Sequence, residues 1–231
     1  MTKVNNIEKF RILSGSWLKI IAMVTMTIDH TAAFLPYFHE HPTLYLAMRS
    51  IGRVAFITFA FLLAEGFYYT RNKKKYGRNL VVFAIISQLP YSLINNHFLF
   101  YSHTNVGFTF LLAFLGMLAM EHYKNEKVKL FAILATIIIV TIYIKPVRGF
   151  SGVGLVWVFY LLRSYQISKM FVGFCMIARN LILGQMLGFA VLSLYNGQRG
   201  FINGPIGKYV FYAFYPLHLF LLWGIRFLYF S

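Results

Sequence analysis

An aspartate and a histidine stand side by side inside a long apolar run near the start of the chain. The run is LKIIAMVTMTIDHTAAFLP, and it contains Asp29, the only aspartate of the sequence, and His30. A charged side chain at membrane depth costs about 2.5–3.5 kcal/mol or more, so an acid beside a titratable imidazole indicates a functional site. The alternative is that Asp29 pairs with an intramembrane arginine and only joins two helices.

His30 shares a predicted helix face with a lysine. Lys19 precedes it by eleven positions, which brings the two within about 20° of one face and about 16 Å apart. A cation at the mouth of a groove and a base at its depth suit a long ligand with an anionic head. His218, two residues after Pro216, is expected at a depth similar to that of His30, entering the membrane from the opposite side.

Asp29 is expected to meet a cation on another helix, because adjacent residues of a helix do not face each other. The next apolar run places Arg49 and Arg53 one turn apart. Arg53 lies deep enough to need an acceptor, and Asp29 is its expected partner, whereas Arg49 has snorkelling to lipid headgroups as an equal alternative. Glu65, near the other end of this run, pairs with the basic loop that follows or contacts substrate.

A later apolar run carries the polar residues Arg179, Asn180 and Gln185. Arg179 is expected near the middle of the membrane, where a charge is least compatible with chance. In an earlier run Gln88 precedes Pro90, and a kink there either opens a polar pocket or has no further role. His39, Glu40 and His41 form an H-x-H pattern in a short loop and could ligate a metal. Because the two histidines have no clear third ligand, no metal is expected.

The composition shows which elements must position these residues. Hydrophobic residues make up 59% of the chain, charged residues 12%, and the mean hydropathy is +0.64, which excludes an ordinary soluble domain. We expect an all-α polytopic bundle forming one domain over 1–231, with 1–16 as a cytoplasmic segment. Eight apolar runs are long enough to cross a ~30 Å hydrocarbon core, at about 17–36, 44–69, 79–95, 106–121, 128–144, 150–163, 170–194 and 209–230.

The basic residues orient these spans. The chain has 22 Lys+Arg against 6 Asp+Glu, and the positive-inside effect and anionic lipids explain this excess without a nucleic-acid partner. The N-terminal segment, the loop TRNKKKYGR and the loops near 124–129 and 163–169 are expected in the cytoplasm, and 37–43 and 95–105 outside. Two loops expected outside are basic nevertheless, IKPVRG and NGQRGFINGPIGK, and they either weaken this topology or mark anion-binding loops.

Several segments together resemble the TraX family, integral membrane proteins named for an enzyme that acetylates the N-terminus of conjugative pilin. The resemblance begins near Trp17 and is carried by LKIIAMVTMTIDH, RSIGRVAFITFAFLLAEGFYYTRNKKKYGRNL, ISQLPY, LYNGQRG and KYVFYAFYPLHL. The family is similar to a wider superfamily of membrane acyltransferases, whose members often have a basic residue eleven positions before an essential histidine, as Lys19 and His30 are spaced here. The chain departs from that pattern at Gln88, near Ser92 and in VRGFSGVG, where acidic residues are expected.

The resemblance implies a bacterial inner-membrane acetyltransferase. Acetyl-CoA would be the acyl donor, with its phosphates held by Lys19 and the basic second loop, and His30 would be the general base on an amine or hydroxyl acceptor. Asp29 would orient the site through Arg53 or Arg179, and Arg53 is counted among the expected catalytic residues. His218 or an arginine would stabilise the developing oxyanion. The other expected donor-binding or acceptor-binding residues are Arg49, Arg179, Asn180, Gln185, Tyr215, Glu65 and Arg71.

The acceptor implied by the resemblance is an exported peptide N-terminus, an envelope sugar or a lipid. Two other classes of function fit the residues. Asp, His and Arg at mid-membrane also build proton relays, so a small proton-coupled transporter is one alternative. A catalytically inactive partner in envelope assembly is the other, because the acidic residues of the acyltransferase pattern are missing.

Overall fold

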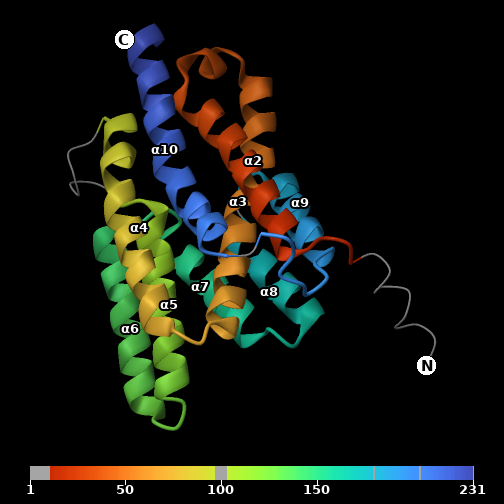
Figure 1. The fold of residues 1–231 in the computed structure, drawn as a ribbon, viewed down its shortest axis with the longest axis vertical. Helices are drawn as coiled ribbons and strands as arrows, with labels where there is room; N and C mark the ends of the chain where they lie inside the picture. Colours follow the sequence, from red (N-terminus) through yellow and green to blue (C-terminus); the bar gives the residue numbers. More distant parts are fainter. Residues whose placement is uncertain (1–10, 97–102, 179, 203, 231) are drawn as a thin grey trace. The chain divides into compact units, whose positions relative to one another are not determined.

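The computed structural model describes residues 11–96, 103–178, 180–202 and 204–230, and its regular structure there is helical (Figure 1). Strands are absent from these ranges, which hold only isolated bridges between residues. The predicted all-α class is therefore confirmed. The elements, in chain order, are α2 (Gly15–Phe34), η1 (Pro36–Glu40), α3 (Pro42–Tyr69), α4 (Lys73–Ile94), α5 (Val106–His122), α6 (Lys127–Ile144), α7 (Gly149–Leu161), α8 (Gln166–Ile177), α9 (Ile182–Ser193) and α10 (Pro205–Phe230).

The helices belong to two compact units. Unit 1 comprises Met1–Leu62 together with Ala178–Ser231, and unit 2 comprises Leu63–Ile177. The first unit therefore joins the beginning of the chain to its end, and α3 contributes residues to both units. A single domain over 1–231 stays a prediction.

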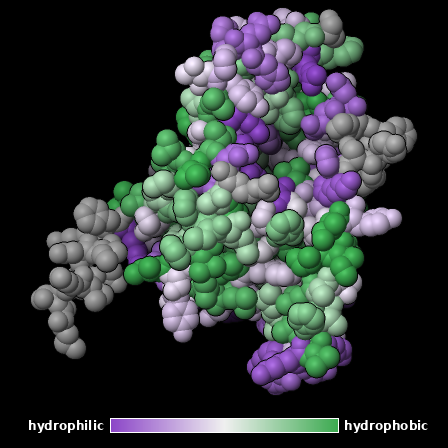
Figure 2. All heavy atoms as spheres, turned by 180° about the vertical axis from the view of Figure 1, so that it is seen from behind, coloured by the Kyte–Doolittle hydropathy of each residue, from purple (hydrophilic) through white to green (hydrophobic). Residues whose placement is uncertain are grey.

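Three helices of the described ranges are long and apolar enough to cross a membrane, Pro42–Tyr69, Lys127–Ile144 and Tyr209–Phe230. Large hydrophobic side chains of α6 are exposed, with Phe131 at 75%, Ile139 at 65% and Tyr143 at 88%. Broad hydrophobic areas also cover the face in Figure 2. Such surface is stable against lipid and not against water, as in a membrane protein. The eight predicted spans are not confirmed.

The prediction of one helix over 170–194 is wrong. The run forms two helices of 12 residues each, α8 and α9, and a helix of that length rises only about 18 Å. Leu181 precedes α9 in the left-handed region, with φ 57° and ψ 50°. Gln185 Nε2 donates a hydrogen bond to the Asn180 carbonyl at 3.0 Å. Asn180 and Gln185 thus form a hydrogen bond at the beginning of the short helix α9.

In unit 1, the residues that lead into α2 hold the segment that follows α9. Leu13 N–H donates to Leu194 O at 2.9 Å, and Asn196 N–H donates to Leu13 O at 2.9 Å. The Ser16 hydroxyl donates to Arg199 O at 3.1 Å. These bonds fix the segment 194–199 at the end of unit 1 where α2 begins.

The first and last helices consequently run in the same direction, as Figure 1 shows. Lys19 lies over the ring of Phe211, with 5.3 Å from Nζ to the ring centroid, and His30 contacts His218 further along both helices. The prediction that the last span enters the membrane from the side opposite to the first is therefore wrong. If the N-terminal segment is cytoplasmic, the loop 197–208 lies on the cytoplasmic side as well, and not outside as predicted. Arg199 then agrees with the positive-inside rule.

Unit 2 is built around α5, which packs against α4, α6 and α7. The indole of Trp157 on α7 donates to Ala113 O at 3.0 Å and covers Gly116, where a Cβ would lie 2.3 Å from the indole. The ring of Phe67 lies 5.4 Å from those of Phe114 and Tyr160. Aromatic edge contacts thus join the end of α3 to this core.

A glycine of α9 allows that helix to touch α3 within unit 1. A Cβ on Gly184 would lie 2.0 Å from the Ser50 carbonyl oxygen. We expect Gly184→Ala to destabilise the protein by about 1–3 kcal/mol, because two backbones would have to separate. Gly224→Ala in α10 is the control, since a Cβ there meets nothing within 4 Å. Thermal melting in detergent measures both, and equal melting temperatures would contradict the expected close contact.

Candidate active site

Two histidines from the first and last helices meet inside unit 1. His30 Nδ1 lies 2.6 Å from His218 Nε2, and the rings are stacked with centroids 4.9 Å apart and planes 3° apart. His218 is 7% exposed. The structure therefore brings together the two histidines that the sequence predicted at a similar depth, although the helices run parallel.

The backbone assigns the protonation of this pair. His218 Nδ1 lies 2.9 Å from the Phe214 carbonyl, and a carbonyl oxygen only accepts, so Nδ1 carries the proton. In the neutral ring Nε2 is then the acceptor, and His30 must donate to it from Nδ1. The lone pair of His30 consequently resides on Nε2, which makes this nitrogen the basic atom of the pair. Sequence reasoning missed Phe214, whose signal is its position four residues before His218 on a helix.

Aromatic side chains surround the histidine pair. The ring of Tyr215 lies 6.0 Å from that of His30 and 5.5 Å from that of His218. Phe34 lies 5.4 Å from His30, and Phe214 stacks on His218 at 5.1 Å. These rings fix the imidazole planes and limit access of water, which strengthens hydrogen bonds within the site.

Asp29 points toward α3 and not toward the histidine pair. Its Oδ2 accepts a hydrogen bond from Arg49 Nη1 at 2.7 Å, and a Cβ on Gly52 would overlap its side chain at 2.2 Å. The close ion pair of Asp29 is thus with Arg49 and not with Arg53 as predicted, although Arg53 also interacts electrostatically with Asp29. The Nε atom of Arg53 is buried and makes no hydrogen bond to the described residues.

The helix face that carries Lys19 and His30 is covered by α10. Phe211 packs on Lys19 and His218 on His30, so the groove predicted along α2 is occupied by the last helix. Arg199 interacts electrostatically with Lys19 and is held by Ser16 at the same end of α2. Two cations therefore lie together where the sequence predicted one.

Other predicted site residues lie elsewhere. In unit 2, Glu65 Oε1 accepts from Arg163 Nε at 2.9 Å, and Arg163 also donates to the Tyr69 hydroxyl at 2.7 Å. The expected pairing of Glu65 with the basic second loop is wrong. Arg71 is exposed in that loop. Arg179 lies outside the described residues, and its neighbours Asn180 and Gln185 bond to each other.

Gln88 occupies a position where the acyltransferase pattern predicts an acid. Its Nε2 donates to Ser92 Oγ at 3.2 Å and to His103 O at 3.3 Å. Its Oε1 accepts from the backbone N–H of Asn105 at 3.0 Å and from Asn105 Nδ2 at 2.9 Å. All four hydrogen-bonding positions of the amide are used, so Gln88 fastens α4 to the segment before α5.

The helical fold, its exposed apolar helices and a part-buried histidine pair between two helices define a membrane protein with a candidate site for acid–base chemistry. Residues 14–226 match the TraX protein family, and the chain belongs to this family. The probable fimbrial assembly protein FimC, serogroup H1, of Dichelobacter nodosus is 28% identical over 238 residues, covering 90% of this chain and 94% of that protein. No solved structure matches the chain.

The two arginines of α3 should differ in their effect on stability. Arg49→Gln leaves the Asp29 carboxylate without its guanidinium, and we expect a cost of about 2 kcal/mol or more. Arg53→Gln removes the same charge one turn away and should cost clearly less. Chemical or thermal unfolding in detergent compares them. Adding Asp29→Asn to Arg49→Gln should restore part of the loss, and a larger effect of Arg53→Gln would contradict the pairing.

Proposed function

We propose that this protein is an acetyltransferase of the bacterial inner membrane that acetylates the amino terminus of an exported pilin-like subunit. The observation that carries the proposal is the hydrogen-bonded histidine pair, in which His30 presents a basic Nε2. Membership of the TraX family supports acetyl transfer to pilin as the activity. The similarity to a probable fimbrial assembly protein supports a subunit of a surface filament as the acceptor.

In the proposed reaction His30 acts as general base. Its Nε2 takes a proton from the acceptor amine as the nitrogen attacks the thioester carbonyl of acetyl-CoA. The new C–N bond forms, the C–S bond breaks, and the CoA thiolate leaves and takes up the proton from the imidazolium. The products are an acetylated amine and CoA, and His30 returns to its starting state.

His218 is a positioning residue in this scheme. Its Nε2 accepts from His30, and this bond becomes charge-assisted and stronger when His30 is protonated. The proton cannot pass beyond His218, because the Phe214 carbonyl only accepts a hydrogen bond. The pair therefore orients the base and stabilises its charged form without conducting a proton away.

The oxyanion requires another donor. Both ring nitrogens of His218 are engaged, with His30 and with the Phe214 carbonyl. Of the two groups predicted to stabilise the oxyanion, His218 or an arginine, the arginine is therefore the better candidate. Arg53 has a buried Nε without a hydrogen bond to the described residues and interacts electrostatically with Asp29, the neighbour of His30. We assign to it the stabilisation of developing negative charge.

The donor phosphates would bind at the end of unit 1 where α2 begins. Lys19 and Arg199 lie close enough to interact electrostatically, and two neighbouring cations suit the polyanionic end of acetyl-CoA. In this proposal Arg199 holds the phosphates together with Lys19, a role that the sequence analysis gave to the basic second loop, which contains Arg71. The amino-terminal segment and this binding site are expected in the cytoplasm, where the donor is found.

A non-catalytic role in filament assembly is the second candidate. The observation that favours it is Gln88, which replaces an acid of the acyltransferase pattern and uses all of its hydrogen-bonding positions within the fold. A protein of this kind would bind the exported subunit without transferring acetyl. It would tolerate the loss of the His30 base.

Labelled acetyl-CoA and purified protein in liposomes separate these candidates, with a synthetic pilin amino-terminal peptide as acceptor. His30→Ala should lower acetyl transfer by about 10²–10⁴-fold, the contribution expected of a general base. His122→Ala, outside the site at the end of α5, should retain full activity. Undiminished transfer by His30→Ala would contradict the assignment. Solute flux without acetylation would favour a carrier.

The role of His218 has its own test. His218→Phe keeps an aromatic ring against Phe214 and Tyr215 but removes the acceptor of the His30 proton. We expect a smaller loss of activity than in His30→Ala, together with a displaced pH–rate profile, since the charged form of His30 loses its partner. An unchanged pH–rate profile would show that His218 only fills space.

A further inference from the structure

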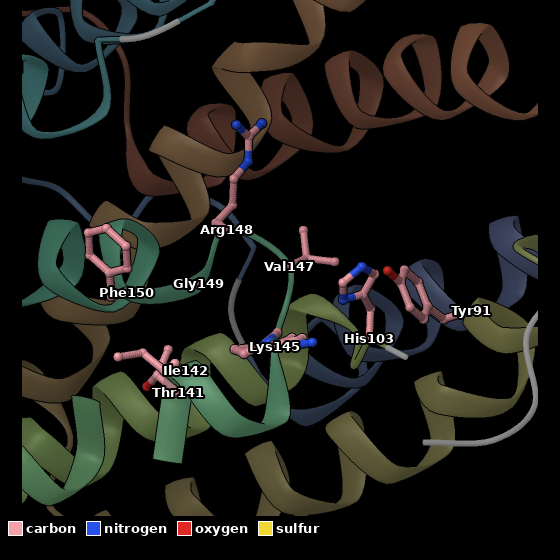
Figure 3. Close-up of a pocket in the computed structure, with 10 residues that line it drawn as sticks. Tyr91, His103, Thr141, Ile142, Lys145, Val147, Arg148, Gly149 and Phe150 are labelled. Atoms are coloured by element: carbon pink, nitrogen blue, oxygen red, sulfur yellow. The ribbon is translucent and has the colours of Figure 1, made fainter. Parts of the chain in front are cut away.

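Unit 2 contains a cavity of about 450 Å³ that the proposed reaction does not use. Its walls come from the end of α4, the segment before α5, the end of α6 and the loop that leads into α7 (Figure 3). Tyr91, His103 and Lys145 contribute polar groups, whereas Ile142, Val147 and Phe150 contribute apolar surface. The cavity thus combines hydrogen-bond donors on one part of its lining with hydrocarbon on another.

The polar side chains lie on one side of this cavity. In Figure 3 the hydroxyl of Tyr91 points toward the ring of His103, and the amino group of Lys145 extends toward the side on which both lie. The side chain of Arg148 extends away from these three. A lysine amine, an imidazole and a phenol can each donate to one anion.

The backbone that carries these residues is fixed by hydrogen bonds. Val147 N–H donates to Thr104 O at 3.0 Å, and the Thr104 hydroxyl donates to Ile144 O at 3.2 Å. Gln88 Nε2 donates to the carbonyl of His103. The backbone segments that carry His103 and Lys145 are therefore held in place before a ligand arrives, which lowers the part of the binding entropy cost that comes from ordering the main chain.

The chain provides little negative charge for this cavity. The carboxylates in the sequence of unit 2 are Glu65, Glu121 and Glu126. Each forms an ion pair with a cation that does not line the cavity, namely Arg163, Lys73 and Lys129 respectively. The exposed amino group of Lys145 thus has no ion pair with these carboxylates, and its charge can attract an anionic ligand.

The cavity lies beside the end of a helix that could cross a membrane. Lys145 directly follows α6, one of the three helices apolar enough to cross a membrane. Ile142 and Phe150, which line the cavity, are each 61% exposed. A cation immediately beyond a hydrocarbon-spanning segment lies at the depth of lipid headgroups, with the apolar residues beside it at the depth of acyl chains.

We propose that this cavity binds a phosphate group, held by Lys145, His103 and Tyr91, with the phosphate of an anionic membrane lipid as its principal source. Ile142 and Phe150 contact the hydrocarbon that adjoins the headgroup. A soluble phosphate ester offers the same oxyanion without the hydrocarbon, so the two sources can be told apart. The proposal does not depend on acetyl transfer.

Native mass spectrometry of the full-length protein in detergent tests the site, with phosphatidic acid as the probe. Diacylglycerol lacks the phosphate, and glycerol 3-phosphate lacks the acyl chains. Wild type should bind phosphatidic acid, and Lys145→Gln and His103→Gln should each weaken binding by about tenfold, the effect of losing a hydrogen bond to a charged group. Lys127→Gln removes one charge at the opposite end of α6 and should bind as wild type does.

The possible results separate clearly. Lys145-dependent binding of phosphatidic acid supports the site and assigns it to lipid, and Lys145-dependent binding of glycerol 3-phosphate alone supports the site and assigns it to a soluble ester. Equal binding of diacylglycerol and phosphatidic acid would overturn the proposal. The proposal would also be overturned if Lys145→Gln and His103→Gln both bound phosphatidic acid as tightly as wild type does. It would be overturned as well if wild type bound none of the three probes. Circular dichroism of the variants establishes that each is folded.

Discussion

The ion pair between Asp29 and Arg49 is the interaction on which unit 1 depends. A carboxylate among apolar helices is stable only with a cation and hydrogen bonds close by, and Arg49 meets this need at 2.7 Å. Gly52 lets the helices approach closely enough for the pair to form, since a Cβ there would overlap Asp29. The adjacent residue of α3, Ser50, receives α9 through Gly184. One short stretch of α3 therefore fixes the helices on both of its sides.

The scarcity of carboxylates shapes what the remaining cations can do. With 6 acidic against 22 basic residues, most lysines and arginines have no carboxylate available to them. The ion pair of Asp29 joins α2 to α3, and that of Glu65 joins α3 to the turn that follows α7. This leaves Lys19, Arg199 and Lys145 near the ends of helices with surplus positive charge. Membrane surfaces and phosphorylated ligands carry the opposite charge. The predicted orientation in the bilayer and both proposed anion sites depend on this surplus of basic residues.

The sequence predicted the helical class from its long apolar runs, and it placed His30 and His218 at a similar depth by counting residues along helices of known rise. Their direct contact was not predicted. The sequence indicated Arg53 and not Arg49 as the ion-pair partner of Asp29, because the two arginines differ by one turn and the choice between them depends on how α2 and α3 cross. It also missed the interruption at Leu181, whose left-handed backbone has no signal from glycine or proline. The predicted direction of α10 depended on the assumption that 170–194 forms one uninterrupted span. Because this run forms two short helices, the loop that contains Arg199 was predicted on the wrong side relative to the beginning of α2.

The parallel packing of α2 and α10 has a consequence for biosynthesis. Asp29 and Arg49 are 20 positions apart, so α2 and α3 can pair as soon as both have been synthesised, with the charge of Asp29 already neutralised. His30 and His218 are 188 positions apart, and Ser16 and Arg199 are 183 apart. The histidine pair therefore cannot assemble until nearly the whole polypeptide has left the ribosome. Nascent or truncated chains lack a completed base, so whatever chemistry the pair performs is confined to fully synthesised protein.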